Sequence, residues 1–368
     1  MTKFIAFYLP QYHPIKENDE WYGKGFTEWT NVAKARPLFK KHYQPHIPAD
    51  LGFYDLRLKE TRREQAKLAQ QYGIEAFCYW NYWFGDGKQL LEMPIWEVYK
   101  DKEITLPFCL AWANHSWEKK MWDKRGSNKI LMEQKYLGED DFKKYFYTML
   151  PLFKDERYFR VHKRPFFIVY NPLESNQIKL FIRVWNDLAR QEGLGSFYFV
   201  GKDFDGRFRK DILKLGFDAV YEDNVLNIHH HMAKIKKGML LIQRKIFKHP
   251  TVFLYKDAIK YMISHNAKRK DVIPVIAPNW DHSPRSGNNA MILHDCQPKY
   301  FEKVAQMAYD AVKNKESDEQ IIIIKAWNEW GEGNHLEPDL KYGKGYLEAI
   351  KHVLLNERKT KENSERIL

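Results

Sequence analysis

The stretch IIIIKAWNEWGEGNHLEPD, residues 321–339, carries the pattern that decides the fold of this 368-residue chain. Its four isoleucines, Ile321–Ile324, form a short continuous apolar run, which is typical of a strand buried in a parallel sheet. Two tryptophans and two glutamates three residues apart, Glu329 and Glu332, follow directly. The stretch therefore predicts a buried strand whose end carries an acidic and aromatic cluster.

Two carboxyl groups at the end of a buried strand suit acid–base chemistry on a sugar. One carboxyl group protonates the leaving oxygen of a glycosidic bond and the second acts on the ring. Trp327 and Trp330 offer flat faces for pyranose rings, and the neighbouring glycines let the backbone turn sharply between the acids. A solvated surface loop is the alternative, and two tryptophans within four residues disfavour it. Glu329 and Glu332 are therefore the candidate catalytic residues.

The composition indicates a folded chain with a surplus of aromatic residues. Hydrophobic residues make up 44% of the chain, which supports a large core and excludes global disorder. Aromatic residues make up 15%, and carbohydrate sites are one destination for surplus Trp and Tyr. The net charge of +12 is spread along the chain with no nucleic-acid motif, so we expect no nucleic-acid partner.

The cysteines and the N-terminal segment bear on where the protein is located in the cell. Cys78, Cys109 and Cys296 are odd in number and spaced like neither a disulfide framework nor a metal site. No apolar stretch is long enough for a transmembrane helix, and MTKFIAFYLPQYH shows no signal-peptide core. We expect a cytoplasmic protein, with peripheral attachment to the inner membrane as an alternative.

Strand patterns and helix patterns alternate eight times along the chain. Strands are expected at 4–10, 74–83, 107–114, 165–171, 197–203, 218–223, 272–279 and 320–327. Helices are expected at 60–72, 89–100, 140–153, 176–192, 208–215, 256–266, 298–314 and 343–357. This alternation predicts an α/β fold, a (β/α)8 TIM barrel with loop insertions. We expect one domain over residues 1–358 and a frayed tail at 359–368.

Polar and aromatic side chains recur at the carboxyl ends of the expected strands, where such barrels place their active sites. The candidate substrate-binding residues are Tyr8, Gln11, His13, Trp80, Trp112, Asn114, Tyr170, Trp280, Asn328 and His335. Stacking faces and hydrogen-bonding groups at so many equivalent positions predict a carbohydrate site.

Five segments carry a family resemblance. They are FYLPQYHPIKENDEWYGKGFTEWTNVAKARPLF (7–39), YQPHIPADLGFYDLR (43–57), YGIEAFCYWNYWF (72–84), FCLAWANHSW (108–117) and WNEWGEGNHLEPD (327–339). They resemble WbsX-type proteins of bacterial surface-polysaccharide gene clusters, which are similar to the endo-α-mannosidases of glycoside hydrolase family 99. The resemblance covers nearly the whole chain and implies a (β/α)8 barrel.

The resemblance also implies a retaining mechanism. Glu329 would take the proton of the sugar's 2-hydroxyl, which attacks C1 to give a 1,2-anhydro sugar, and Glu332 would protonate the leaving oxygen and later activate water. Tyr8 and Trp112 match the family's aromatic residues after strands 1 and 3, and Tyr170 matches less well. The N-terminal FYLPQYH departs from the hydrolase pattern and the segment 11–57 is particular to the WbsX branch, so mannose specificity is not carried over.

The leading hypothesis is a retaining, endo-glycosidase-like enzyme that acts on an α-linked bacterial surface polysaccharide or its precursor. One alternative is a glycosyltransferase or transglycosylase of O-antigen or capsule biosynthesis. Another is a noncatalytic glycan-binding barrel, which the presence of both glutamates disfavours.

The expected partner is a carbohydrate, with no cofactor and no metal, since three contiguous histidines at 229–231 cannot easily ligate one ion. The insertion at 226–250 interleaves basic and apolar residues. We expect it to project from the face that carries the site and to contact a membrane surface or an anionic glycan.

Overall fold

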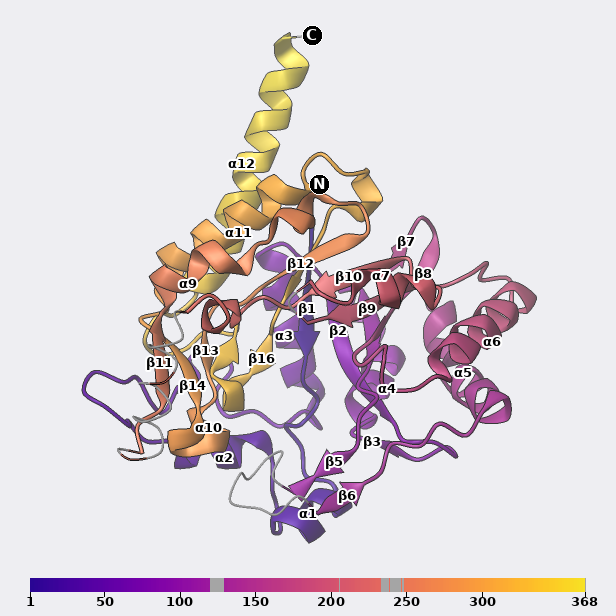
Figure 1. Cartoon of the computed structure of the whole chain (residues 1–368), viewed down its shortest axis with the longest axis horizontal. Coiled ribbons are helices and arrows are strands. Elements are labelled where there is room, and N and C mark those ends of the chain that lie inside the picture. The colour runs from indigo at the N-terminus through magenta and orange to yellow at the C-terminus, as the bar shows by residue number, and fades with distance from the viewer. Residues whose placement is uncertain (120–128, 205, 233–237, 239–245, 247, 368) are drawn as a thin grey trace.

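Eight parallel strands close into a barrel (Figure 1). The computed structural model describes residues 1–119, 129–204, 206–232, 238, 246 and 248–367. Around the barrel the strands are β1 (Lys3–Tyr8), β2 (Ile74–Trp83), β4 (Phe108–Trp112), β8 (Arg164–Val169), β9 (Tyr198–Asp203), β10 (Ala219–Glu222), β12 (Val272–Ile276) and β15 (Ile321–Ile324). Because β1 pairs in parallel with both β2 and β15, the sheet has no open edge. The predicted TIM barrel and its single domain are confirmed.

Helices follow the strands as the alternation predicts. They are α3 (Lys59–Gln71), α4 (Met93–Lys100), α5 (Glu139–Lys154), α6 (Ile178–Gln191), α7 (Arg209–Lys214), α9 (Tyr255–Met262), α11 (Pro298–Val312) and α12 (Gly345–Ile367). Two expected helices are shorter than predicted, because residues 89–90 pair with β2 as β3 (Gln89–Leu90) and residues 265–268 form the separate 3-10 helix η3 (His265–Lys268).

The last helix runs further than the sequence suggests. Residues 359–367, where we expect a frayed tail, continue α12, which leaves the body of the molecule (Figure 1). Lys, Glu and Arg predominate there and neither Gly nor Pro interrupts them, so helix propensity is favourable. Across the part of the chain that the structure describes, none of the helices combines the length and the apolar character needed to cross a membrane.

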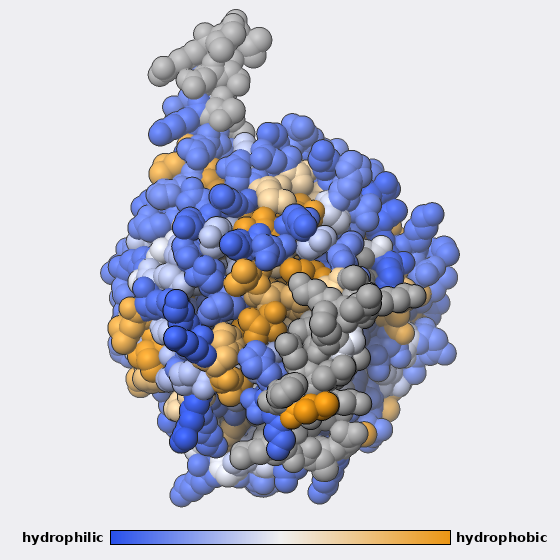
Figure 2. Space-filling view, turned by 60° about the vertical axis from the view of Figure 1, so that its left-hand side comes forward, coloured by the Kyte–Doolittle hydropathy of each residue, from blue (hydrophilic) through white to orange (hydrophobic). Residues whose placement is uncertain are grey.

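Short elements in the loops cover the barrel. Those formed by the loops after β1, β12 and β15 are α1 (Lys16–Tyr22), α2 (Glu28–Lys34), β13 (Trp280–Asp281), α10 (Ser283–Ser286), η4 (Gly287–Asn289), β14 (Met291–His294), β16 (Asn328–Glu329), η6 (Trp330–Glu332) and β17 (Asn334–His335). The others are β5 (Trp117–Glu118), β6 (Ile130–Met132), β7 (Arg160–Val161), η2 (Asn227–His229), β11 (Thr251–Leu254) and η5 (Ser317–Glu319). The face that includes α9 and the β11–β14 sheet gathers apolar side chains in its middle, with hydrophilic ones around them (Figure 2).

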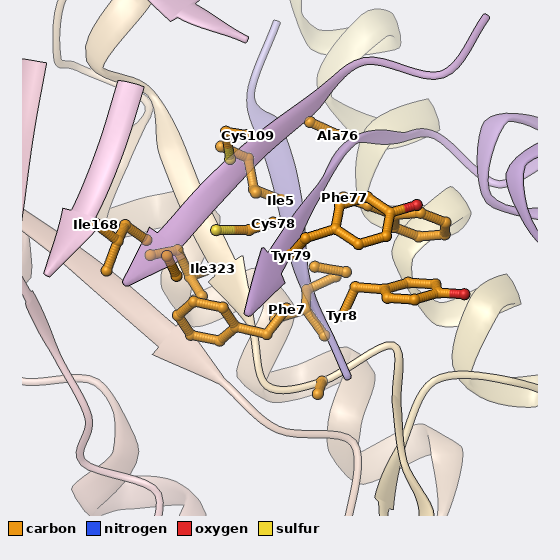
Figure 3. Packing of buried hydrophobic residues seen from close by; sticks show 14 of the residues in the cluster. Ile5, Phe7, Tyr8, Ala76, Phe77, Cys78, Tyr79, Cys109, Ile168 and Ile323 are labelled. Atoms are coloured by element: carbon orange, nitrogen blue, oxygen red, sulfur yellow. The ribbon is translucent and has the colours of Figure 1, made fainter. Parts of the chain in front are cut away.

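Alternation along the strands separates the barrel interior from the layer beneath the helices. Phe7 and Ile323 lie on one side of β1 and β2, and Tyr8 and Phe77 lie on the other (Figure 3). The Tyr8 hydroxyl donates to Oε1 of Gln65 on α3 at 2.7 Å. Because successive side chains of a strand point to opposite faces, Tyr8 faces the helices, and Phe7 takes the inward position.

Asn328 joins the end of the first strand to the loop after the last one. Its Oδ1 accepts from the backbone N–H of Leu9 at 2.7 Å, and its Nδ2 donates to the Leu9 carbonyl at 3.0 Å. The Asn328 side chain is fully buried. It therefore completes the closure of the barrel beside the candidate glutamates.

We expect Asn328→Ala to lower the free energy of unfolding by about 1–3 kcal/mol, because the substitution leaves the buried N–H and C=O of Leu9 without partners. Urea unfolding followed by tryptophan fluorescence measures the change. Asn288→Ala, at an exposed position, is the control and should change stability by less than about 0.5 kcal/mol. Equal stability of the two variants would show that Asn328 does not secure the closure.

Candidate active site

The loop after β15 folds tightly and presents both glutamates. β16 and β17 pair antiparallel, with Glu329 opposite Asn334. Gly333 has φ +51°, a left-handed conformation that favours glycine. A Cβ at Gly331 would lie 1.6 Å from Oε1 of Glu28, so only glycine fits between the loop and α2. The glycines of the motif therefore serve a close approach as well as a turn.

Glu332 shares a buried arginine with a second carboxylate. Nη1 of Arg285 lies 2.5 Å from Oε1 of Glu332. Nε and Nη2 of the same guanidinium donate to Oε1 and Oε2 of Glu28 at 3.0 and 2.8 Å. Nε2 of His282 lies 3.6 Å from Glu332 Oε1. Loops after β1, β12 and β15 thus meet in one charge network, which we call the Glu28–Arg285–Glu332 network.

Glu329 lies against the aromatic wall of the barrel. Trp80 Nε1 donates to Oε1 of Glu329 at 2.9 Å. The Trp80 ring stacks on Phe7, with centroids 4.5 Å apart, and meets Tyr170 edge to face at 5.4 Å. The predicted site residues Trp80 and Tyr170 are therefore gathered beside Glu329, with Phe7 in place of Tyr8.

The two glutamates hold different protonation states. Burial, and then the charge of Glu332, raises the pKa of Glu329 to about 8 against the opposing effect of Arg285 and Lys325. Burial also acts to raise the pKa of Glu332, but Arg285 and then His282 outweigh it and hold that pKa well below its usual range. At neutral pH the proton therefore sits on Glu329 and Glu332 is ionised. The resemblance implies the opposite distribution, with the proton on Glu332 as the donor and Glu329 ionised as the base.

A cleft of about 270 Å³ opens at the carboxyl ends of five strands. Its lining includes Tyr170, Lys202, Asp223, Asn227, Trp280 and Lys325. Trp280, a predicted substrate contact, thus faces this cleft together with Tyr170. The cleft also receives Lys325, whose ammonium is close enough for the charges of Glu332 and Glu329 to raise its pKa.

Several predicted contacts belong to the framework instead. Trp112 is fully buried, donates from Nε1 to the Trp83 carbonyl at 3.0 Å and packs against Phe181 of α6, so it lies in the helix layer with Tyr8. Asn114 uses both its oxygen and its nitrogen on the backbone of Asn171, at 2.7 and 2.8 Å. Tyr8, Trp112 and Asn114 therefore do not face the cleft. The resemblance selected Tyr8 and Trp112, and the strand-end pattern selected Asn114, by position along the strands, and position alone does not specify the side to which a side chain points.

Gln11 and His13 are buried near the end of β1. Neither Oε1 nor Nε2 of Gln11 has a hydrogen-bond partner among the described residues. Burial lowers the pKa of His13 to about 4, so the imidazole is neutral. Within the described part of the chain, neither side chain forms a hydrogen bond with Glu329 or Glu332.

The third acid of the motif, Glu337, is structural. Its carboxyl group accepts from Trp330 Nε1, Gln65 Nε2 and the Tyr54 hydroxyl at 2.6, 2.7 and 3.0 Å. Burial raises its pKa to about 7. With Asn328, it anchors the loop from below.

His335 forms a cluster with His46 and Asp339, the buried group in the described chain whose donor atoms lie close enough to hold a metal. Nδ1 of His335 lies 2.9 Å from the Glu337 carbonyl, so Nε2 accepts from Nδ1–H of His46 at 2.9 Å. The ring also stacks on Trp330 at 3.7 Å. Hydrogen bonds explain the positions of the His46 and His335 rings without a metal. His335 therefore supports the loop and does not face the cleft.

Sequence reasoning missed the charged residues that surround the glutamates. Lys325 follows the isoleucine run directly and Lys202 lies near the end of β9, so their place at strand ends was a usable signal. Glu28 and Arg285 lie in loop insertions, and no pattern marked them. The insertion at 226–250 begins at the cleft, which Leu226–Asn227 and His229–His230 line, as expected. Its Lys234, Lys236 and Lys237 lie outside the described residues.

Known proteins share both the sequence and the fold. The model of the family described as "Glycosyltransferase WbsX" matches residues 4–350. Two proteins called "Uncharacterized protein WxcX", from Xanthomonas campestris pv. campestris strains B100 and ATCC 33913, are each 38% identical over 356 residues. The match covers 95% of this chain and 49% of theirs, so the chain spans about half the length of these relatives.

Solved structures agree on the fold. A "glycoside hydrolase-like protein" matches 96% of this chain and 93% of its own, with TM-score 0.60 and 13% identity. The GH99 endo-α-mannosidase from Bacteroides thetaiotaomicron matches 98% of each chain, with TM-score 0.57 and 15% identity. At this identity the likeness concerns the barrel alone, while the family match rests on sequence along nearly the whole chain. The chain therefore belongs to the Glycosyltransferase WbsX family.

Proposed function

We propose that this chain acts, with retention, on the anomeric carbon of an α-linked bacterial surface polysaccharide or its precursor, through Glu329 and Glu332. The observation that carries the proposal is the pair of glutamates at the end of β15, where the Trp80 indole holds Glu329 and the Arg285 guanidinium holds Glu332. A noncatalytic glycan-binding barrel would gain nothing from burying this pair, because burying carboxyl groups costs free energy. The cytoplasmic location and the membrane contact stay predictions.

Hydrolysis in the manner that the resemblance implies requires a transfer of the resting proton. Glu329 must lose it to act on the 2-hydroxyl, and Glu332 must gain it to protonate a poor leaving group. The sugar hydroxyl that enters would stabilise ionised Glu329 by donating to it. Arg285 opposes protonation of Glu332, since its guanidinium pairs with the ionised form.

This pairing favours transfer of a glycosyl group as the second candidate function. A donor whose leaving group departs without protonation needs no proton on Glu332, while an ionised Glu332 is suited to take the proton of an acceptor hydroxyl. The family description and the ionised state of Glu332 both favour glycosyl transfer over hydrolysis.

We expect Glu329→Gln to become more stable relative to the wild type as pH rises from 5 to 8. The raised pKa of Glu329 means that the folded state binds a proton that the unfolded state has released, so its contribution to stability falls through this window by at most about 1.4 kcal/mol per pH unit. Above pH 8 both states are ionised and the difference levels off. Thermal unfolding at pH 5, 6, 7, 8 and 9 measures it without a substrate.

Glu75→Gln is the matched control for this titration, because Glu75 is exposed. Its stability relative to the wild type should stay flat over the same range. A flat difference for Glu329→Gln as well would mean that Glu329 is ionised in the resting enzyme.

We expect Glu332→Gln to lose about 10²–10⁴-fold in turnover on α-linked glycan fragments, because acid–base catalysis is removed. An aryl glycoside with an activated leaving group should keep part of its rate in this variant. Glu329→Gln should be slow on both, since the 2-hydroxyl is no longer activated. Efficient cleavage of a 2-deoxy analogue by the wild type would contradict the anhydro-sugar route. Glu75→Gln again serves as the control.

A further inference from the structure

The cleft beside the glutamates holds two lysines against aromatic rings. Nζ of Lys202 lies 4.1 Å from the centroid of the Tyr170 ring, and Nζ of Lys325 lies 4.5 Å from the centroid of the Trp280 ring. The two side chains are only 11% and 16% exposed. Both ammonium groups are therefore held in place at the cleft wall, with little of their charge screened by solvent.

The two lysines share a single carboxylate. Oδ2 of Asp223 lies 2.9 Å from Nζ of Lys325 and 3.7 Å from Nζ of Lys202. Among the described residues no other carboxylate is within 4.0 Å of either ammonium group. Among the described residues that line the cleft, these two positive charges and one negative charge give an excess of one positive charge. Each ammonium group has three N–H donors, so donors remain for a ligand beside Asp223.

Lys325 lines this cleft, and the cleft borders the carboxyl pair, because the ring of Tyr170 in its wall contacts Trp80, the donor to Glu329. Lys325 follows β15 directly, four residues before Glu329. Burial acts to lower the pKa of its ammonium group, but Asp223 and Glu332 outweigh it and keep the group charged. An anion bound at Lys325 would therefore lie next to a sugar carbon that Glu329 and Glu332 act on.

The state of Glu332 gives independent support for an anionic substituent at that carbon. Arg285 bridges Glu332 to Glu28 and keeps Glu332 ionised, so the resting site lacks a proton donor at this position. A phosphate ester leaves as a stable anion and needs no proton. An ordinary glycosidic oxygen needs one.

We propose that this cleft binds a phosphate or diphosphate group attached to the anomeric carbon of the substrate, with Lys202 and Lys325 as its ligands. This inference rests on the proposed function and specifies its substrate class, a glycosyl phosphate or diphosphate. Over the complete transfer, the bond between C1 and the phosphate oxygen breaks and its electron pair stays on that oxygen. C1 bonds to the oxygen of an acceptor hydroxyl, whose proton passes to ionised Glu332.

Isothermal titration of the full chain with inorganic pyrophosphate tests the proposal without a known substrate. We expect saturable binding that Lys325→Gln and Lys202→Gln each weaken by about tenfold, because a hydrogen bond between charged groups is lost. Asp223→Asn should bind pyrophosphate more tightly than the wild type, since it removes the competing carboxylate. This opposite sign separates a ligand site from a merely structural ion pair.

Lys344→Gln is the matched control, because Lys344 pairs with Asp50 at the same 2.9 Å, away from the lysines of the cleft. Thermal unfolding verifies that each variant is folded. A wild type that does not bind pyrophosphate, an equal loss in Lys344→Gln, or glucuronate binding as tight as pyrophosphate would overturn the proposal.

Further titrations distinguish the source of the phosphate. Tighter binding of UDP or GDP than of pyrophosphate would support a nucleotide-linked sugar, and equal binding would support a diphosphate carried by another group. Both outcomes support the phosphate site. Failure of pyrophosphate to bind, with the effects of Glu329→Gln and Glu332→Gln intact, would remove this inference and leave the proposed function in place.

Discussion

The buried contact between Arg285 and its two carboxylates is the constraint on which the candidate site depends. It joins the loops after β1, β12 and β15 within one guanidinium. Removing one member of a buried ion pair is strongly destabilising, by about 3–5 kcal/mol, because the partner charge stays buried without compensation. Gly331 is part of the same constraint, since the loop can approach Glu28 only without a side chain there.

This constraint also determines how the carboxyl pair divides its proton. Arg285 pairs with Glu332 directly, while Glu329 receives a neutral donor, the Trp80 indole. Two carboxyl groups with the same intrinsic chemistry therefore take different charges, and the cause is their partners. The Lys202 and Lys325 ammonium groups supply positive charge in the cleft beside this pair. The site is thus prepared for an anionic substrate group beside an ionised base.

Aromatic residues serve two separate layers in this barrel. Trp80 contacts both Phe7 and Tyr170 at the mouth, while Tyr8 and Trp112 pack beneath the helices. The high aromatic content therefore does not by itself indicate a carbohydrate site, because part of it packs beneath the helices. Only the inward positions of each strand are available to a ligand, since neighbouring side chains alternate between the two layers.

The sequence by itself determined the barrel and the place of the glutamates. Eight apolar runs that alternate with helix patterns predict eight strands, because local periodicity reports which residues must be buried. The run Ile321–Ile324 places Glu329 and Glu332 at a strand end. Only the tertiary structure decided what surrounds them. Glu28 and Arg285 are 257 residues apart, and no local pattern records a contact between side chains that folding alone brings together. The charge of Glu332, and the choice between Phe7 and Tyr8 at the mouth, follow from that three-dimensional packing.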